Sequence, residues 1–195
     1  MAANNSEGEY IYMKKIVLLG DSIRLWGYGT KVPELLGENY EVCQPEDNCR
    51  FAKYTLRGLF DWGDIIKGAD VIHWNNGLWD CTEIFDDGVF TTEEEYINNM
   101  VRIATLLKKV TPNVIFATTT PVWDEFEWTH NDKIQRYNEI IVPVLKEMGI
   151  KINDLNTAVS ADIHKYVKEC DKIHLSEAGI DLCADLVVKA IKEFD

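Results

Sequence analysis

Two short motifs, one near each end of the chain, contain the residue types that nucleophilic catalysis requires. Gly20-Asp21-Ser22 follows an early run of apolar residues, and Asp171 stands three residues before His174 near the other end. This spacing on a turn brings a carboxylate beside an imidazole and fixes the ring tautomer, while the other ring nitrogen accepts a proton from a serine hydroxyl. The three side chains predict a nucleophile, a general base and its orienting carboxylate.

Each motif also has an ordinary structural interpretation when it is taken alone. Asp21 and Ser22 are residue types that commonly cap the N-terminus of a helix. An aspartate and a histidine three residues apart near a helix start form a surface pair worth roughly 1 kcal/mol or less. The catalytic interpretation gains weight because both motifs are expected at strand ends on the same edge of one sheet.

Short apolar runs alternate with longer helical patterns after Met13, which indicates one α/β domain. Four continuous runs are typical of strands buried on both faces of a parallel sheet, and a weaker run at residues 40–43 adds a fifth. The four continuous runs are residues 16–19, 71–74, 114–117 and 150–152. Ligands bind beyond the carboxyl ends of such strands, so the residues that directly follow the runs are candidate site residues.

Three segments have the periodicity of amphipathic helices. The first begins at Thr92, which together with Glu95 has the spacing of a capping box. The second covers residues 132–148 despite Pro143, and Ser176 opens the third. Helices between parallel strands predict a three-layer α/β/α sandwich.

The composition is that of one soluble globular domain. The 195 residues are 46% hydrophobic and 27% charged, and 33 acidic against 20 basic residues give a net charge of −13. Such a charge repels phosphate backbones and anionic lipid, so neither nucleic acid nor a membrane is expected as a partner. Five cysteines without a Cys-x-x-Cys pair indicate free thiols and a cytoplasmic location.

Residues 1–12 are a polar leader, and we expect them to form a flexible N-terminal extension to a single domain of residues 13–195. None of the four histidines belongs to a metal-binding pair, so neither a metal nor another cofactor is expected. We interpret His73 as a structural hydrogen-bonding residue and His164 as part of an exposed helix. The sequence leaves the formation of a homo-oligomer open.

Gly20-Asp21-Ser22 and Asp171-x-x-His174 resemble motifs of the GDSL/SGNH hydrolase family, whereas no G-x-S-x-G elbow of an α/β-hydrolase is present. The resemblance extends from about residue 14 to the last helix. It implies a flavodoxin-like fold with a five-stranded parallel sheet. It also implies that Ser22 is the nucleophile, His174 the general base and Asp171 its orienting residue.

The letters SGNH in the family name stand for a serine, a glycine, an asparagine and a histidine, so a glycine and an asparagine remain to be identified. The glycine block resembles Gly58, whose backbone N–H is then expected to join that of Ser22 in an oxyanion hole. Gly63 is a competitor for this role. A loop glycine that serves backbone freedom explains Gly58 equally well.

The asparagine block departs from the usual G-x-N-D, because residues 73–80 read HWNNGLWD. This stretch is more similar to an N-x-G-L-H-D variant found in one branch of the family. The similarity implies that Asn75 supplies the side-chain donor of the oxyanion hole, with Asn76 as the second choice. An ordinary Asn-Gly turn explains Asn76 well and Asn75 less well.

Residues 121–130, after the apolar run at residues 114–117, combine three aromatic rings with three carboxylates. Aromatic platforms beside acidic groups suit sugar rings, although simple packing of the aromatic side chains explains the segment equally well. We interpret Asp21, Asn76, Trp123 and His130 as substrate-binding residues.

The resemblance implies a serine esterase, and the branch with the variant asparagine block is similar to carbohydrate acetylesterases. We expect hydrolysis of a short acyl ester, most simply acetate, on a carbohydrate, so that the partner is a small-molecule ester such as an acylated sugar. The alternatives are a short-chain acyl esterase or thioesterase, or a lysophospholipase-like acylhydrolase. A non-catalytic sugar-binding protein on the same scaffold is a hypothesis of another class.

Overall fold

Five parallel strands form the central sheet of the protein, which the computed structural model describes over residues 3–4, 10–85 and 87–195. The strands are β3 (Lys14–Leu19), β4 (Tyr40–Cys43), β5 (Val71–Trp74), β6 (Val114–Ala117) and β7 (Lys151–Asn153). Their order is β4-β3-β5-β6-β7, and each neighbouring pair is parallel. β5 and β6 are buried along their whole length, as apolar strands between two helical layers should be.

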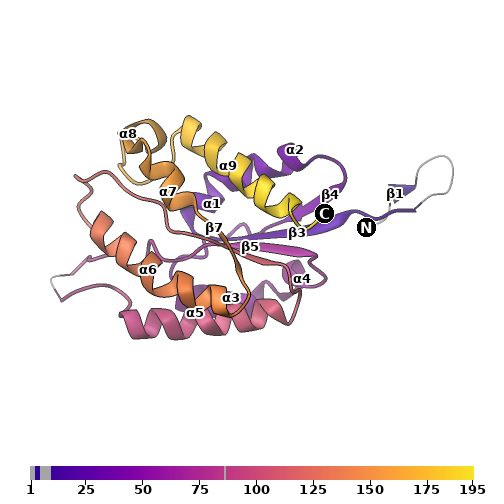
Figure 1. Ribbon diagram of the computed structural model, residues 1–195, viewed down its shortest axis with the longest axis horizontal. Helices are drawn as coiled ribbons and strands as arrows, with labels where there is room; N and C mark the ends of the chain where they lie inside the picture. The colour runs from indigo at the N-terminus through magenta and orange to yellow at the C-terminus, as the bar shows by residue number, and fades with distance from the viewer. Residues whose placement is uncertain (1–2, 5–9, 86) are drawn as a thin grey trace.

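Helices cover both faces of this sheet (Figure 1). One face carries α1 (Ser22–Leu25), the 3-10 helix η1 (Tyr28–Thr30), α2 (Val32–Leu36), α7 (Leu155–Ser160), α8 (Ile163–Tyr166) and α9 (Glu177–Lys192). The other face carries α3 (Ala52–Asp61), α4 (Gly63–Ile66), α5 (Glu93–Lys108) and α6 (Asn131–Glu147). The predicted three-layer sandwich with a five-stranded parallel sheet is confirmed.

The helix starts that the sequence predicts are also found. Thr92 accepts the backbone N–H of Glu95 and the Glu95 carboxylate accepts that of Thr92, which completes the capping box of α5. Ser176 accepts the N–H of Gly179 at the start of α9. α6 continues through Pro143, as expected.

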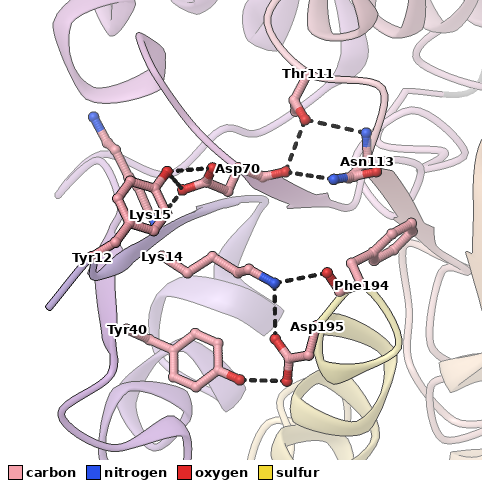
Figure 2. Close-up of polar contacts among 9 residues, drawn as sticks. All are labelled: Tyr12, Lys14, Lys15, Tyr40, Asp70, Thr111, Asn113, Phe194 and Asp195. Atoms are coloured by element: carbon pink, nitrogen blue, oxygen red, sulfur yellow. Dashed lines mark hydrogen bonds and ion pairs between the residues drawn. The ribbon is translucent and has the colours of Figure 1, made fainter.

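The predicted N-terminal extension, residues 1–12, lies partly outside the described residues. Within it, β1 (Ala3–Asn4) pairs antiparallel with β2 (Tyr10–Ile11). The Tyr12 hydroxyl then donates to the Asp70 carboxylate, which also accepts the backbone N–H of Lys15 (Figure 2). The flexibility of the extension and the domain boundary after residue 12 stay predictions.

Polar contacts tie the end of the chain to the amino ends of β3 and β4 (Figure 2). Lys14 Nζ donates to the carbonyl oxygen of Phe194 at 2.7 Å and to Asp195 Oδ1 at 3.0 Å. The Tyr40 hydroxyl donates to Asp195 Oδ2 at 2.6 Å, and burial together with this carboxylate raises the pKa of Tyr40 to about 12. These contacts stabilise the edge of the sheet that lies opposite the carboxyl ends of the strands.

The strand order reverses between β3 and β5, since β4 lies on one side of β3 while β5, β6 and β7 follow on the other. This is the flavodoxin-like order, and such sheets bind ligands beyond the carboxyl ends of the strands at the reversal. Leu19 and Trp74 are register partners at those ends. The two segments that follow them, residues 20–22 and 75–80, therefore start side by side.

A buried carboxyl group, that of Asp80, connects the segment after β5 to the start of α3. Its oxygens accept the backbone N–H of Ala52 at 3.1 and 3.0 Å. Burial raises the pKa of Asp80 to about 7, against the opposing effect of hydrogen bonds from Ala52 and Thr91.

We predict that Asp80 makes the free energy of unfolding decrease as the pH rises from 3.8 to about 7. In this range the unfolded chain has lost the Asp80 proton while the folded protein retains it, so the unfolded state binds fewer protons and is favoured by rising pH. The free energy of unfolding should decrease by an amount on the order of a few kcal/mol over this range in the wild-type protein, and this decrease should be absent in Asp80→Asn. Denaturant unfolding at several pH values measures the difference.

The matched control is Asp61→Asn, which changes an exposed aspartate at the end of α3. We expect this variant to follow the pH dependence of the wild-type protein. A difference between Asp80→Asn and wild type that stays constant from pH 4 to about pH 7 would contradict the prediction.

Candidate active site

A cavity of about 550 Å³ opens at the carboxyl ends of the strands, and both predicted catalytic motifs line it. Ser22, Asp171 and His174 all belong to its wall. The other lining residues are mostly aromatic or aliphatic: Trp26, Asn48, Phe51, Leu78, Trp79, Thr82, Ile84, Phe90, Phe126, Trp128, Thr129 and Ile173. The structure thus brings a segment from early in the chain and a segment from late in the chain together at one site.

Ser22 is the first residue of α1, directly after the turn that ends β3. Asp21 caps this helix, because its Oδ1 accepts the backbone N–H of Ile23 at 2.9 Å. The turn needs glycine at position 20, since a Cβ there would lie 1.9 Å from Asn75 Oδ1. The backbone N–H of Ser22 is in the first turn of the helix and has no acceptor in the described part of the chain.

Asp171 orients His174 through both the imidazole and the backbone. Its Oδ2 lies 3.1 Å from His174 Nδ1, and its Oδ1 accepts the backbone N–H of His174 at 2.9 Å. Burial opposes ionisation of Asp171, but these bonds and one from the N–H of Ile173 outweigh it and lower its pKa. Because a carboxylate only accepts, Nδ1 carries the proton, and Nε2 is the basic nitrogen.

No hydrogen bond joins the Ser22 hydroxyl to His174 among the residues that the structure describes. Such bonds often form fully only with bound substrate. The indole of Trp26 packs edge-on against the His174 ring, with ring centroids 5.3 Å apart. The imidazole is therefore fixed from one side by Asp171 and from the other by Trp26.

Gly58, which the sequence suggests as an oxyanion donor, does not line the cavity. It lies inside α3, where a backbone N–H is used by the hydrogen bonds of the helix itself. A Cβ at this position would lie 2.3 Å from the Trp62 ring, so close helix packing explains the glycine. The assignment to the oxyanion hole was wrong, and its competitor Gly63 begins α4 outside the cavity wall.

The carboxamide of Asn75 also lies outside the cavity wall. Its Oδ1 accepts a hydrogen bond from the Tyr28 hydroxyl at 2.9 Å and packs against Gly20. Burial raises the pKa of Asp21, and the Asn75 amide beside this carboxyl partly opposes the rise. Asn75 therefore packs against the turn that precedes Ser22.

The carboxamide of Asn76 is also buried and hydrogen-bonded within the protein. Its Oδ1 accepts the indole N–H of Trp74, and its Nδ2 donates to the carbonyl oxygen of Arg50 at 2.8 Å and to Thr55. Both asparagines of the predicted block are buried, and neither belongs to the wall of the cavity.

None of the four predicted substrate-binding residues lines the cavity. Asp21 and Asn76 are buried beneath it. The indole N–H of Trp123 donates to the carbonyl oxygen of Val167 at 3.1 Å, so this ring is an anchor for the loop. His130 is the exposed residue that precedes α6.

The segment that was predicted to bind substrate nevertheless contributes to the cavity through two other aromatic residues, Phe126 and Trp128. Asn48 and Phe51, which follow β4, also line the cavity and were not among the predicted site residues. The signal was present, because residues after the fifth apolar run meet the same sheet edge as those after the other four.

The structural interpretations of two histidines are confirmed. His73 Nε2 lies 3.2 Å from the Asn153 amide nitrogen, and burial lowers the pKa of His73 to about 3. His164 is exposed on α8. Within the described ranges, no three His, Cys, Asp or Glu side chains are grouped to hold a metal ion, and no helix is long and apolar enough to cross a membrane.

No family model matches the chain. Over 114 residues the chain is 31% identical to the GDSL esterase/lipase CPRD49 of Arabidopsis thaliana, a match that covers 51% of this chain and 44% of that protein. The chain thus spans less than half the length of the curated relative that it matches.

The fold is that of solved structures at low sequence identity. The lipase/acylhydrolase from Enterococcus faecalis matches with a TM-score of 0.76 and 21% identity, over 93% of this chain and 96% of that one. The acetyl xylan esterase AlAXEase matches with a TM-score of 0.75 and 20% identity, over 91% and 99%. The chain thus resembles a GDSL esterase/lipase over about half of its length and shares its fold with solved lipase/acylhydrolase and acetyl xylan esterase structures.

Proposed function

We propose that this chain hydrolyses carboxylic esters with Ser22 as nucleophile, His174 as general base and Asp171 as the carboxylate that orients it. One observation carries the proposal: the Asp171–His174 pair, joined at 3.1 Å, lines the same cavity as a serine hydroxyl from the opposite end of the chain. The curated relative, a GDSL esterase/lipase, supports the same reaction class.

The geometry fits acyl transfer in two steps. His174 Nε2 takes the proton of Ser22 Oγ as this oxygen bonds to the ester carbonyl carbon, and Asp171 stabilises the imidazolium that forms. The tetrahedral intermediate collapses when His174 returns the proton to the leaving alcohol. Water then attacks the acyl-enzyme with His174 again as base, which releases the acid and restores Ser22. The free backbone N–H of Ser22 is one donor to the oxyanion of each intermediate.

For the substrate, the proposal is a short acyl ester, most simply acetyl, on a carbohydrate. The cavity of about 550 Å³ is much larger than an acetyl group, so most of its wall is available to the alcohol part of the ester. Six aromatic residues form much of that wall: Trp26, Phe51, Trp79, Phe90, Phe126 and Trp128. Such rings stack against the apolar C–H faces of sugars. AlAXEase, with the same fold, is an acetyl xylan esterase.

A longer apolar acyl group is the second candidate, because aliphatic side chains complete the wall. Leu78, Ile84 and Ile173 lie among the aromatic rings of the cavity. A hydrocarbon chain placed there gains about 0.8 kcal/mol for each buried CH₂ group. In the first candidate the alcohol part of the ester occupies most of the cavity, and in the second the acyl chain does.

We expect Ser22→Ala and His174→Ala to lower kcat on an aryl acetate by about 10⁶, and Asp171→Asn by about 10⁴. The first two remove the nucleophile or the base, and the third leaves the imidazole in the wrong tautomer. Steady-state kinetics and labelling of Ser22 by a fluorophosphonate measure the effect. Ser160→Ala, at the exposed end of α7, is the control and should retain wild-type kcat.

Hydrolysis that persists in Ser22→Ala would contradict the triad. A wild-type protein that neither reacts with the fluorophosphonate nor turns over any aryl ester would support a non-catalytic sugar-binding protein instead.

A series of acetyl, butyryl and octanoyl aryl esters, followed by acetylated xylose oligomers, tests the substrate. We expect kcat/KM to be highest for the acetyl ester and to rise further on the acetylated sugars. The highest kcat/KM on the octanoyl ester would contradict this choice and favour the longer acyl group.

Trp128→Ala should raise KM for an aryl or sugar acetate about tenfold with little change in kcat, because an exposed ring of the cavity wall is lost. Phe60→Ala is the matched control, since Phe60 is an exposed aromatic residue on α3 outside the cavity. Equal KM values for the two variants would contradict a substrate-binding role of Trp128.

A further inference from the structure

The oxyanion hole lacks a side-chain donor from the places where the sequence predicts one. The N–H of Gly58 is inside α3, the Asn75 amide lies beside the buried Asp21 carboxyl outside the cavity wall, and Asn76 Nδ2 donates to the carbonyl oxygen of Arg50. Since one backbone N–H from Ser22 seldom stabilises an oxyanion by itself, a second donor should face the same cavity.

Asn48 has a carboxamide with a free donor at the wall of this cavity. Its Oδ1 accepts the backbone N–H of Arg50 at 2.8 Å. That bond requires the oxygen on this side of the amide and therefore assigns Nδ2 to the other side. Nδ2 has no acceptor within the described residues, although the residue is partly buried.

The segment around Asn48 is held rigidly against the turn that carries the nucleophile. The buried guanidinium of Arg24, on α1, donates to the carbonyl oxygens of Asp47 at 2.7 Å and of Gly20 at 3.0 Å. On the other side of Asn48, the N–H of Cys49 donates to the carbonyl oxygen of Gly20 at 3.1 Å, and the N–H of Gly20 donates to Cys49 Sγ. Both neighbours of Asn48 are thus tied to Gly20, two residues before Ser22.

The backbone after Asn48 is shaped to make its amide available. Arg50 has a φ of 48°, in the left-handed region that residues with a side chain rarely adopt. Its carbonyl oxygen accepts Asn76 Nδ2 at 2.8 Å, which holds this conformation in place. Strain of this kind persists where the surrounding contacts fix it, and it places the Arg50 N–H on Asn48 Oδ1.

We propose that Asn48 is a catalytic residue whose Nδ2 donates to the oxyanion beside the backbone N–H of Ser22. This assignment rests on the proposed ester hydrolysis. Among the other lining side chains, the Thr82 hydroxyl already contacts the carbonyl oxygen of Leu78 and the Thr129 hydroxyl. No lysine or arginine belongs to the wall in the described part of the chain, so the donors to the oxyanion are neutral groups.

The test compares Asn48→Asp and Asn48→Ala in steady-state hydrolysis of an aryl acetate by the full chain. Asn48→Asp keeps an oxygen for the Arg50 N–H and removes the donor, so it separates the two roles of the amide. We expect both variants to lower kcat by about 10²–10³ with KM within threefold of wild type, across the pH range of activity. Thermal unfolding of Asn48→Asp should stay close to that of wild type.

The control is Glu46→Ala, which removes an exposed side chain of the same segment and leaves the Asn48 donor and the backbone partners of Arg24 intact. Its kcat should stay within threefold of wild type. An Asn48→Asp variant with wild-type kcat would overturn the proposal and leave Asn48 a loop-fixing residue. Hydrolysis by the wild type that does not depend on Ser22 would overturn the proposed function and this assignment with it.

Discussion

A fully buried guanidinium, that of Arg24, is the contact on which the arrangement of the site depends. Its N–H groups bind backbone carbonyl oxygens of the nucleophile turn and of the segment after β4, so a change in either segment leaves a buried cation without its partners. Removing one partner of a buried charge costs several kcal/mol, which makes this joint stiff. The carboxyl of Asp21 lies close enough for Arg24 to lower its pKa, against the larger effect of burial.

The parallel sheet brings these segments to the same place as Asp171 and His174. Because β3 and β5 are register partners up to Leu19 and Trp74, the segments that follow them leave the sheet at one level. The loop before α9 reaches the same place from the far end of the chain and carries Asp171 and His174. Gly20 packs so closely against Asn75 that no side chain fits between the turn after β3 and the segment after β5. The start of α1 therefore lies directly at the carboxyl ends of these strands.

Sequence patterns predicted the sheet and the contact between Asp171 and His174 well, because both depend on local spacing. They failed where the answer depends on residues that are distant in the chain. The hydroxyl that binds Asn75 Oδ1 comes from Tyr28, 47 residues earlier in the chain, whereas Gly58 was assigned wrongly because its own helix, α3, was not predicted. Trp123 and Trp128 are similar in sequence context, and only packing against Val167 separates the anchor from the cavity residue.

The apolar wall of the cavity and the acidic surface of the protein have a joint consequence for the proposed reaction. A chain with a net charge of −13 offers a developing oxyanion little help at long range. Stabilisation must then come from short N–H···O contacts, which are strongest where aromatic side chains exclude water and lower the local dielectric. The aromatic rings proposed to hold the substrate would therefore also strengthen the two proposed donors, the N–H of Ser22 and the amide of Asn48. Polar substitutions in the wall weaken both functions together.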